Sequence, residues 1–266
     1  MNVLARFFKR HPFVLVPFVF YALTCSPTVG SGAPAMHIDS AMRGVISTHV
    51  DSHNIMLMTG WLFKYLPIPE LAARMNLVSA FYGALAVVGL YFALLCLSRG
   101  RGDRRGDGRW ESAWGASLLM VSHSVWWHST IFESYAINAA FTTWALYLML
   151  EFEYSSRIGF LYAASFLAGL SVFNHISMGM LCVGVGIGGL SFIARQPRPV
   201  MLTLKSLGFA LAGLSPWMGV LIRDCSRLGL GNGLNEAFDL GHEPLTPNEP
   251  TLDLVQALDD VEVVGV

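Results

Sequence analysis

Residues 75–97 read MNLVSAFYGALAVVGLYFALLCL, and this run contains no charged side chain. A helix needs about 20 mostly apolar residues to cross the hydrocarbon core of a bilayer. The run meets that length, so it predicts a membrane-spanning helix.

Similar apolar runs recur along the whole chain. Hydrophobic residues make up 54% of its 266 residues, charged residues only 13%, and the mean hydropathy is +0.52. A soluble domain of this size carries about a quarter charged residues. The composition therefore predicts an all-α, polytopic membrane helical protein. About seven transmembrane helices are expected, at residues 12–29, 75–97, 112–127, 131–150, 158–173, 176–194 and 202–222. Residues 55–67 are too short to cross and predict an interfacial helix in the first external loop.

The basic residues test the topology, because cytoplasmic loops carry an excess of lysine and arginine. With a cytoplasmic N-terminus and alternating spans, twelve of the 17 lysine and arginine residues fall on the cytoplasmic side. Several of them belong to the glycine-rich loop at residues 99–109. We therefore predict a multi-pass integral membrane protein of a bacterial inner membrane or the endoplasmic reticulum, with its N-terminus in the cytoplasm.

The end of the chain has a different character. Residues 231–266 contain eight acidic residues, no lysine or arginine, and three prolines that interrupt the segment. This composition predicts a flexible acidic tail. Two parts are thus expected: a transmembrane domain at residues 1–230, which could be a truncated one, and the tail at residues 231–266.

One long polar interruption, residues 27–69, lies on the non-cytoplasmic side in this topology. Asp39 is a candidate general base toward an acceptor hydroxyl, or a metal ligand, and Asp51 is its possible substitute. A solvated loop acid or a helix N-cap also explains Asp39. His49 and His53 are four residues apart and share one face if the segment is helical. With an aspartate they could bind a divalent metal, and hydrogen bonding to a phosphate or sugar is the simpler alternative.

Later polar residues fall at the same predicted side. Glu133, Tyr135 and Asn138 lie within about one and a half helical turns of each other. Glu133 is either a functional acid or a helix N-terminal charge that the helix dipole favours. His175 interrupts two apolar runs. The cytoplasmic loops hold no comparable group, and the chain contains no nucleotide-binding loop, no GxSxG and no nucleic-acid motif.

Five separated segments resemble one family in the order in which they occur. They are SPTV (26–29), STHVDSHNIMLMTGWLFKYLP (47–67), AARMNLVSAFYGALAVVGLY (72–91), HSVWWHSTIFESYAINAAF (123–141) and GLSVFNHISMGML (169–181). Over about residues 22–180 the chain is similar to a large family of polytopic membrane proteins catalogued as a domain of unknown function. That family is related to protein O-mannosyltransferases and has the GT-C glycosyltransferase architecture.

The resemblance implies roles for individual residues. Asp39-Ser40 matches the first half of the family's Asp-Ser-Gly-Glu motif, whose acid works as the catalytic base, while Ala41-Met42 replaces the second half. His49 keeps the histidine of a His-Pro-Pro-Gly-Tyr-Pro run. Further matched positions are Arg74, Asn76, Glu133, Tyr135, Asn138, Asn174 and His175.

These implications lead to a first hypothesis, an integral-membrane glycosyltransferase of the O-mannosyltransferase kind. A sugar would move from a polyprenyl-phosphate donor to a hydroxyl of a protein or glycan acceptor on the non-cytoplasmic side. Asp39 would take the hydroxyl proton, and Arg43, His49 or His53 would stabilise the leaving phosphate. Arg74, Glu133, Tyr135, Asn138 and His175 would bind donor or acceptor. No cofactor is assigned, and a divalent metal is a possible one.

Two other classes remain as alternatives. A catalytically degenerate or truncated relative would act as a membrane scaffold or lipid-binding subunit. A transporter would carry ionisable residues in the middle of its spans, whereas these spans are almost free of charge there. Membrane lipids are expected partners in each case, and nucleic acids are not.

Overall fold

A computed structural model describes residues 3–30, 33–49, 52–100 and 108–238, and all regular secondary structure within these ranges is helical. The predicted all-α class is therefore confirmed. The elements are α1 (Val3–Arg10), η1 (Pro12–Leu15), α2 (Val16–Thr24), α3 (Ala33–Arg43), α4 (Asn54–Phe63), α5 (Leu71–Gly100), α6 (Arg109–Val121), α7 (His123–Thr130), α8 (Tyr135–Ser155), α9 (Ile158–Asn174), η2 (Ile176–Met178), α10 (Gly179–Ile193), α11 (Pro199–Leu228) and α12 (Leu230–Phe238).

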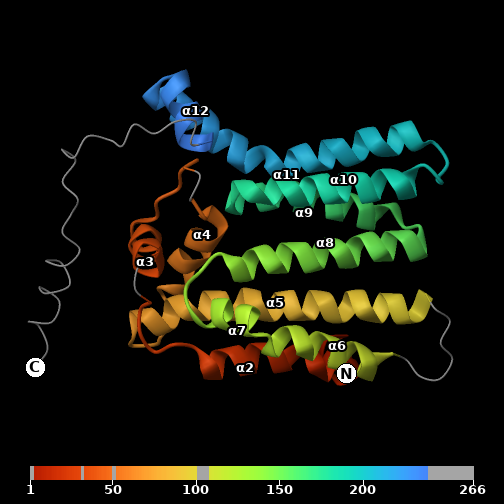
Figure 1. Ribbon diagram of the computed structural model, residues 1–266, viewed down its shortest axis with the longest axis horizontal. Helices are drawn as coiled ribbons and strands as arrows, with labels where there is room; N and C mark the ends of the chain where they lie inside the picture. Colours follow the sequence, from red (N-terminus) through yellow and green to blue (C-terminus); the bar gives the residue numbers. More distant parts are fainter. Residues whose placement is uncertain (1–2, 31–32, 50–51, 101–107, 239–266) are drawn as a thin grey trace, which may run out of the picture.

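The long helices form a bundle in which successive helices run in opposite directions (Figure 1). α5 packs along α8, α8 along α9, and α9 along α11, while α2, α6 and α7 contact α5 from its other side. Because the direction alternates, α3, α4, the α7–α8 connection and the end of α9 meet at one end of the bundle. The α8–α9 and α10–α11 connections lie at the opposite end.

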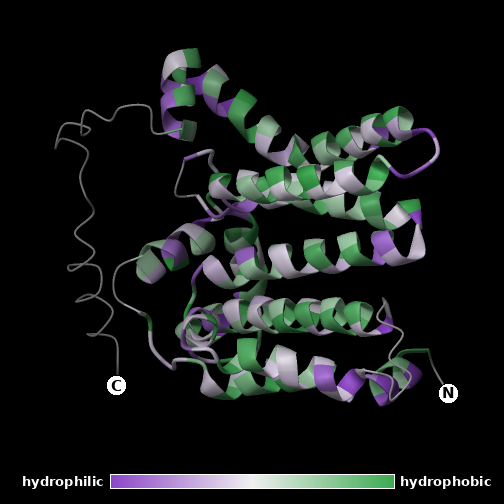
Figure 2. Ribbon diagram, turned by 45° about the vertical axis from the view of Figure 1, so that its right-hand side comes forward, coloured by the Kyte–Doolittle hydropathy of each residue, from purple (hydrophilic) through white to green (hydrophobic). Residues whose placement is uncertain are grey.

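The outer surface of the bundle suits lipid. Three helices of the described chain are long and apolar enough to cross a membrane, at Leu71–Arg99, Ile176–Ile193 and Pro199–Leu228. Large apolar side chains on α10 and α11, such as Ile187 and Leu204, are exposed, and Figure 2 shows hydrophobic residues along the bundle helices. Extended apolar faces of this kind are unfavourable in water and favourable against hydrocarbon chains. The chain is a membrane protein.

Two of the predicted spans are divided in the structure. Residues 12–29 form η1 and α2, and α2 already ends at Thr24. Residues 112–127 are interrupted at Ser122, where an extended backbone separates α6 from α7. The Ser122 hydroxyl donates to the Leu119 carbonyl at 2.8 Å, a local bond that competes with helix continuation. The predicted interfacial helix corresponds to α4.

α8 begins at Tyr135, later than the predicted start at residue 131. Phe132 is fully buried among side chains that include Ile38 and Met75. The Ser79 hydroxyl accepts a hydrogen bond from the Glu133 N–H at 3.0 Å and donates one to the Glu133 carbonyl at 3.2 Å. These contacts hold residues 131–134 as a connection, so Glu133 precedes the helix instead of lying in its first turn.

α9 and α11 are in close backbone contact. A Cβ at Gly169 would overlap the Ala210 carbonyl oxygen, and a Cβ at Gly213 would overlap the Phe166 carbonyl oxygen. Small residues at a crossing let two membrane helices approach closely and gain van der Waals contact.

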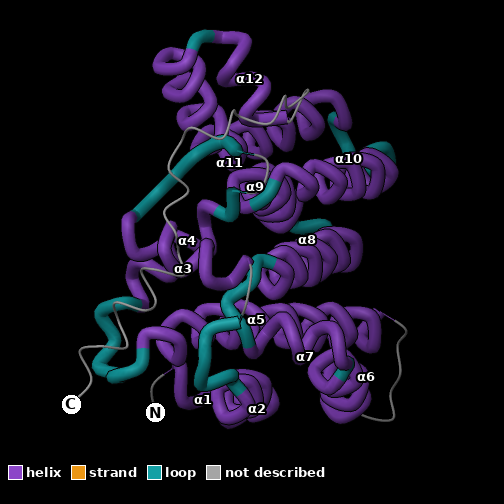
Figure 3. Tube along the Cα trace, turned by 60° about the vertical axis from the view of Figure 1, so that its left-hand side comes forward, coloured by secondary structure: helices purple, strands orange, loops and turns teal. Residues whose placement is uncertain are grey.

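The second half of α11 bends away from the bundle (Figure 1), and this helix contains an internal proline, Pro216, which removes a backbone hydrogen bond. Beyond the bend, the chain turns into α12, where Ala237 is fully buried and the Phe238 ring lies 5.9 Å from that of Trp217. Residues 231–238 of the predicted tail are thus helical, and residues 239–266 lie outside the described part. Figure 3 shows the loop between α3 and α4 reaching toward this part of α11.

The α9–α11 contact yields a test of the fold. We expect Gly213→Ala to lower the melting temperature in detergent relative to Gly208→Ala, because overpacking costs about 1–3 kcal/mol. Gly208 is a matched control: it lies on the same helix, and an added Cβ there meets nothing within 4 Å. Both changes carry the same helix-propensity gain of about 1 kcal/mol. Differential scanning fluorimetry measures the difference, and equal melting temperatures would contradict the close contact.

Candidate functional site

A cavity of about 690 Å³ lies at the end of the bundle that carries α3 and α4. Its walls come from α3 and the loop after it, the beginning of α4, the beginning of α8 and the segment that follows α9. The lining residues are Ala33, Met36, His37, Ser40, Val45, Ser47, His49, Ser52, His53, Leu57, Glu133, Ser134, Tyr135, Asn138, His175 and Ser177. Six of the predicted site residues are therefore brought together: His49, His53, Glu133, Tyr135, Asn138 and His175.

Asp39 is not among the lining residues. α3 presents Ala33, Met36, His37 and Ser40 to the cavity, a helical spacing that defines one face. Asp39 lies off this face in the middle of the helix, so the N-cap interpretation is wrong. Its carboxylate accepts a hydrogen bond from Arg43 at 2.9 Å, and both side chains are exposed. An exposed pair at this spacing contributes only about 0.3–0.5 kcal/mol.

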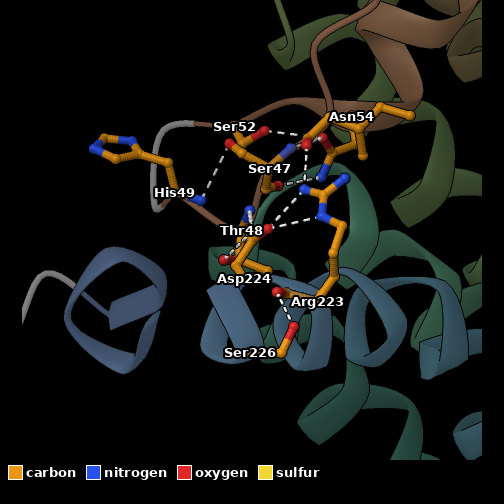
Figure 4. Close-up of polar contacts among 9 residues, drawn as sticks. Ser47, Thr48, His49, Ser52, Asn54, Arg223, Asp224 and Ser226 are labelled. Atoms are coloured by element: carbon orange, nitrogen blue, oxygen red, sulfur yellow. Dashed lines mark hydrogen bonds and ion pairs between the residues drawn. The ribbon is translucent and has the colours of Figure 1, made fainter. Parts of the chain in front are cut away.

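The loop between α3 and α4 is organised by the buried side chain of Asn54. Its Oδ1 accepts hydrogen bonds from the Ser47 N–H at 3.2 Å and the Ser52 hydroxyl at 3.0 Å, and its Nδ2 donates to the Ser47 carbonyl at 2.8 Å (Figure 4). His49 and Ser52 thereby reach the cavity from a loop, so the helical face expected for His49 and His53 is wrong. Asp51 lies outside the described residues.

Three imidazole rings meet beside the cavity, where the ring of His53 stacks on that of His175 and is edge-on to that of His37. The ring centroid of His53 lies 4.8 Å from that of His37 and 4.9 Å from that of His175. His53 is buried, and among the described residues its Nδ1 has no hydrogen-bond partner. Burial, with smaller contributions from the two neighbouring histidines, lowers the pKa of His53 to about 3. His53 is therefore a neutral hydrogen-bonding group at physiological pH.

Glu133 supplies the only carboxylate among the described lining residues. Its backbone is held by Ser79, as described above, while its side chain faces the cavity lined by Ser134, Tyr135 and Asn138. Burial raises the pKa of Glu133, and a hydrogen bond from the Ser134 backbone opposes that effect. The carboxylate is thus a better proton acceptor than an exposed glutamate.

Asn174 joins three helices of the site. Its Nδ2 donates to Asn138 Oδ1 on α8 at 2.9 Å, and its Oδ1 accepts from the Met56 N–H on α4 at 3.1 Å. The next residue, His175, accepts at Nδ1 from the Ser177 N–H at 3.1 Å. The predicted Asn174-His175 joint is present, since α9 ends at Asn174.

Two further predicted residues have different surroundings. Arg74 donates to the Lys64 carbonyl and, at 3.5 Å, to the Pro69 carbonyl, so it braces the turn between α4 and α5 and does not line the cavity. Tyr135 is exposed at the cavity rim, and its ring centroid lies 4.4 Å from that of His128.

The sequence patterns did not identify His37 or the serine residues that line the cavity. His37 precedes Ser40 by three residues, so a helix starting near residue 33 already places both on one face. No sequence motif marks Ser47, Ser52, Ser134 and Ser177, which reach the cavity from separate segments. Within the described ranges, no group of three or more His, Cys, Asp or Glu side chains is arranged to hold a metal ion.

Comparison with known proteins identifies one family. The family described as "Protein O-mannosyl-transferase TMEM260 N-terminal domain" matches residues 46–197, more than half of the chain. Neither the curated proteins nor the solved structures contain a match. The matched segment includes every cavity-lining residue except Val45 and those of α3. It confirms the predicted relation to protein O-mannosyltransferases. The chain belongs to the family of the protein O-mannosyl-transferase TMEM260 N-terminal domain.

Proposed function

We propose that this chain is an integral-membrane glycosyltransferase that moves a sugar from a polyprenyl-phosphate donor to a hydroxyl of a protein or glycan acceptor. The observation that carries the proposal is the cavity in the family-matched part of the chain. It combines one carboxylate with hydroxyl, imidazole and amide groups, which is the set of groups that hydrogen-bonds a sugar and accepts a proton.

The cavity also favours a lipid-linked donor. It lies at the end of an apolar bundle, where an isoprenoid chain can remain in the hydrocarbon layer while the sugar enters the polar space. No lysine or arginine occurs among the described lining residues, so the lining offers no cation cluster for the diphosphate of a nucleotide sugar. The excess of basic residues predicted at the other helix ends supports a non-cytoplasmic cavity. A GT-C-like arrangement of about seven spans is part of the same proposal.

Glu133 is the base that we propose for the reaction. The acceptor hydroxyl attacks the anomeric carbon, its proton passes to the Glu133 carboxylate, and a new glycosidic C–O bond forms. The bond from the anomeric carbon to the donor phosphate breaks, and the lipid phosphate leaves with that electron pair. A raised pKa brings the base closer to the working pH, which favours general-base catalysis.

The neutral groups of the cavity assist the leaving phosphate and the sugar. Serine hydroxyls and imidazole N–H groups donate hydrogen bonds to phosphate oxygens without a formal charge. Asn138, held by Asn174, and the rim residue Tyr135 are positioned to contact the sugar or the acceptor. Asp39 and Asp51 remain predicted alternatives to Glu133 as the base.

A second candidate function has one observation in its favour. Asp39, which matches the family's acidic motif, is exposed and paired with Arg43 outside the cavity lining. This favours the degenerate relative that binds lipid phosphate or serves as a scaffold. Such a protein binds the donor but transfers no sugar, so a transfer assay separates the two functions.

Glu133→Gln tests the proposed base. We expect transfer of labelled mannose from polyprenyl-phosphate mannose to an acceptor peptide to fall about 10²–10⁴-fold, since general-base catalysis contributes that much. Donor binding should remain, because glutamine keeps the size and hydrogen-bonding capacity of the side chain. Glu111→Gln, in the first turn of α6 and away from the cavity lining, is the matched control and should be fully active.

The other carboxylates are tested in the same assay. If Glu133→Gln retains wild-type transfer while Asp39→Asn or Asp51→Asn abolishes it, the base is one of these aspartates and our assignment is wrong. If the wild-type chain binds the donor but transfers nothing under conditions in which a longer relative works, the second candidate function holds.

The buried His53 predicts a dependence of stability on acid. Its pKa in the folded chain is about 3, below the unfolded value of 6.5, so between these values the unfolded chain binds more protons. The contribution of His53 to stability is complete above pH 6.5 and is lost as the pH falls toward 3, by at most about 1.4 kcal/mol per pH unit. We expect the melting temperature to fall less in the His53→Gln variant than in the wild type when the pH is lowered from 7.5 to 5. A parallel loss in both proteins would show that His53 is not buried in its neutral form.

A further inference from the structure

The loop that lines the cavity is bonded to a distant part of the chain. Asp224, near the end of α11, accepts two hydrogen bonds at Oδ2, from the Thr48 N–H at 3.0 Å and from the Thr48 hydroxyl at 2.9 Å (Figure 4). Thr48 is 3% exposed and Asp224 is 9% exposed. A carboxylate that accepts bonds from both donors of one residue fixes the position of that residue.

Arg223 completes the contact from the other side. Its Nη2 donates to the Ile46 carbonyl at 2.5 Å, and its Nε donates to Asp224 Oδ1 at 2.8 Å. The guanidinium thus bonds the loop and orients the carboxylate that holds Thr48. Because the Arg223 guanidinium pairs with it, the buried Asp224 carboxylate is not an uncompensated charge.

An apolar cluster supports these polar bonds. Ile46 packs with Val220 and Leu221 against the buried Trp217 and Phe173. This last part of α11 lies near the loop (Figure 3). Hydrogen bonds in such a partly dry surrounding are stronger than the same bonds in water.

The bonded residues sit next to cavity residues. Thr48 lies between Ser47 and His49, both of which line the cavity. Asn54 holds Ser47 and Ser52 from the start of α4, while Asp224 and Arg223 hold Ile46 and Thr48 from α11. Two sets of bonds thus hold this wall, and the second comes from residues beyond the family-matched segment 46–197.

We propose that Arg223 and Asp224 are positioning residues, which act through Thr48 to hold His49 and the neighbouring serines against the phosphate and sugar of the donor. The inference rests on the proposed function, and it adds that the end of α11 sets donor affinity. Neither residue lines the cavity, so both act on the substrate only through the loop.

Four variants test this proposal. Asp224→Ala removes the acceptor of both bonds, and Thr48→Val removes only the hydroxyl bond. Thr48→Ser keeps both donors and serves as the conservative rescue. Ser226→Ala is the matched control on the same turn, because among the described residues its hydroxyl bonds only the Arg223 carbonyl within α11 (Figure 4).

Two measurements are made on the 266-residue chain in detergent. We expect Asp224→Ala to speed hydrogen exchange of the Thr48 and Ser52 amides about tenfold or more and to raise the KM for polyprenyl-phosphate mannose by a similar factor, with a smaller change in kcat. Thr48→Val should show a smaller increase of both quantities. Thr48→Ser and Ser226→Ala should match wild type.

The outcomes separate the possible failures. Unchanged exchange in a folded Asp224→Ala variant overturns the anchor, and faster exchange with unchanged KM and kcat overturns the positioning role. If Asp224→Ala does not fold, equal behaviour of Thr48→Val and Thr48→Ser overturns the proposal by itself. If the wild-type chain transfers no sugar, the proposed function fails, and the inference is then decided by exchange and by the Kd for polyprenyl-phosphate mannose.

Discussion

A peptide group in the hydrocarbon layer has no water to bond, so each N–H and C=O must find its partner within its own segment. Every described segment in the bundle meets this requirement as a helix. Polar chemistry is consequently confined to the places where helices begin and end. His53 lies just before α4, Glu133 lies just before α8, and His175 follows α9. The cavity exists because the alternating helix directions bring these three ends together.

Hydrogen bonds from buried asparagine side chains hold several of these helix ends and loops in place. Asn174 bonds α8 and α4, Asn54 organises the loop after α3, and Asn76 donates to the Ser26 carbonyl at 2.8 Å. An amide both donates and accepts without a charge, so it can be buried with its bonds satisfied at far lower cost than an ion. The Arg223–Asp224 pair is an exception that stands where the bent end of α11 leaves the bundle.

The fold was largely predictable because its signal is local. Apolar length indicated where most helices lie, and this property depends on neighbours in the chain. The membrane sides assigned from the arginines stay a prediction. The misplaced boundaries have tertiary causes. Residues 131–134 stay out of α8 because Phe132 is buried against Ile38 and because Ser79 bonds the Glu133 backbone. A hydropathy pattern contains neither contact.

The candidate site was predictable only in part. Motif comparison singled out Glu133, Asn138 and His175, and these do meet in one cavity, because the start of α8 and the end of α9 lie at the same end of the bundle. Motif comparison also singled out Asp39, but this side chain pairs with Arg43 outside the cavity lining. A helix of eleven residues has several faces, and the motif does not say which face lines the cavity.

By itself, the sequence determined a helical membrane protein, its alternating order and the family to which it belongs, because hydropathy and motif order are properties of the linear chain. Only the tertiary structure decided which polar groups share a cavity, that His53 is buried beside His37 and His175, and that Asp224 holds Thr48. These relations join residues up to 176 positions apart. They arise from packing and from the satisfaction of buried polar groups, which no local pattern records.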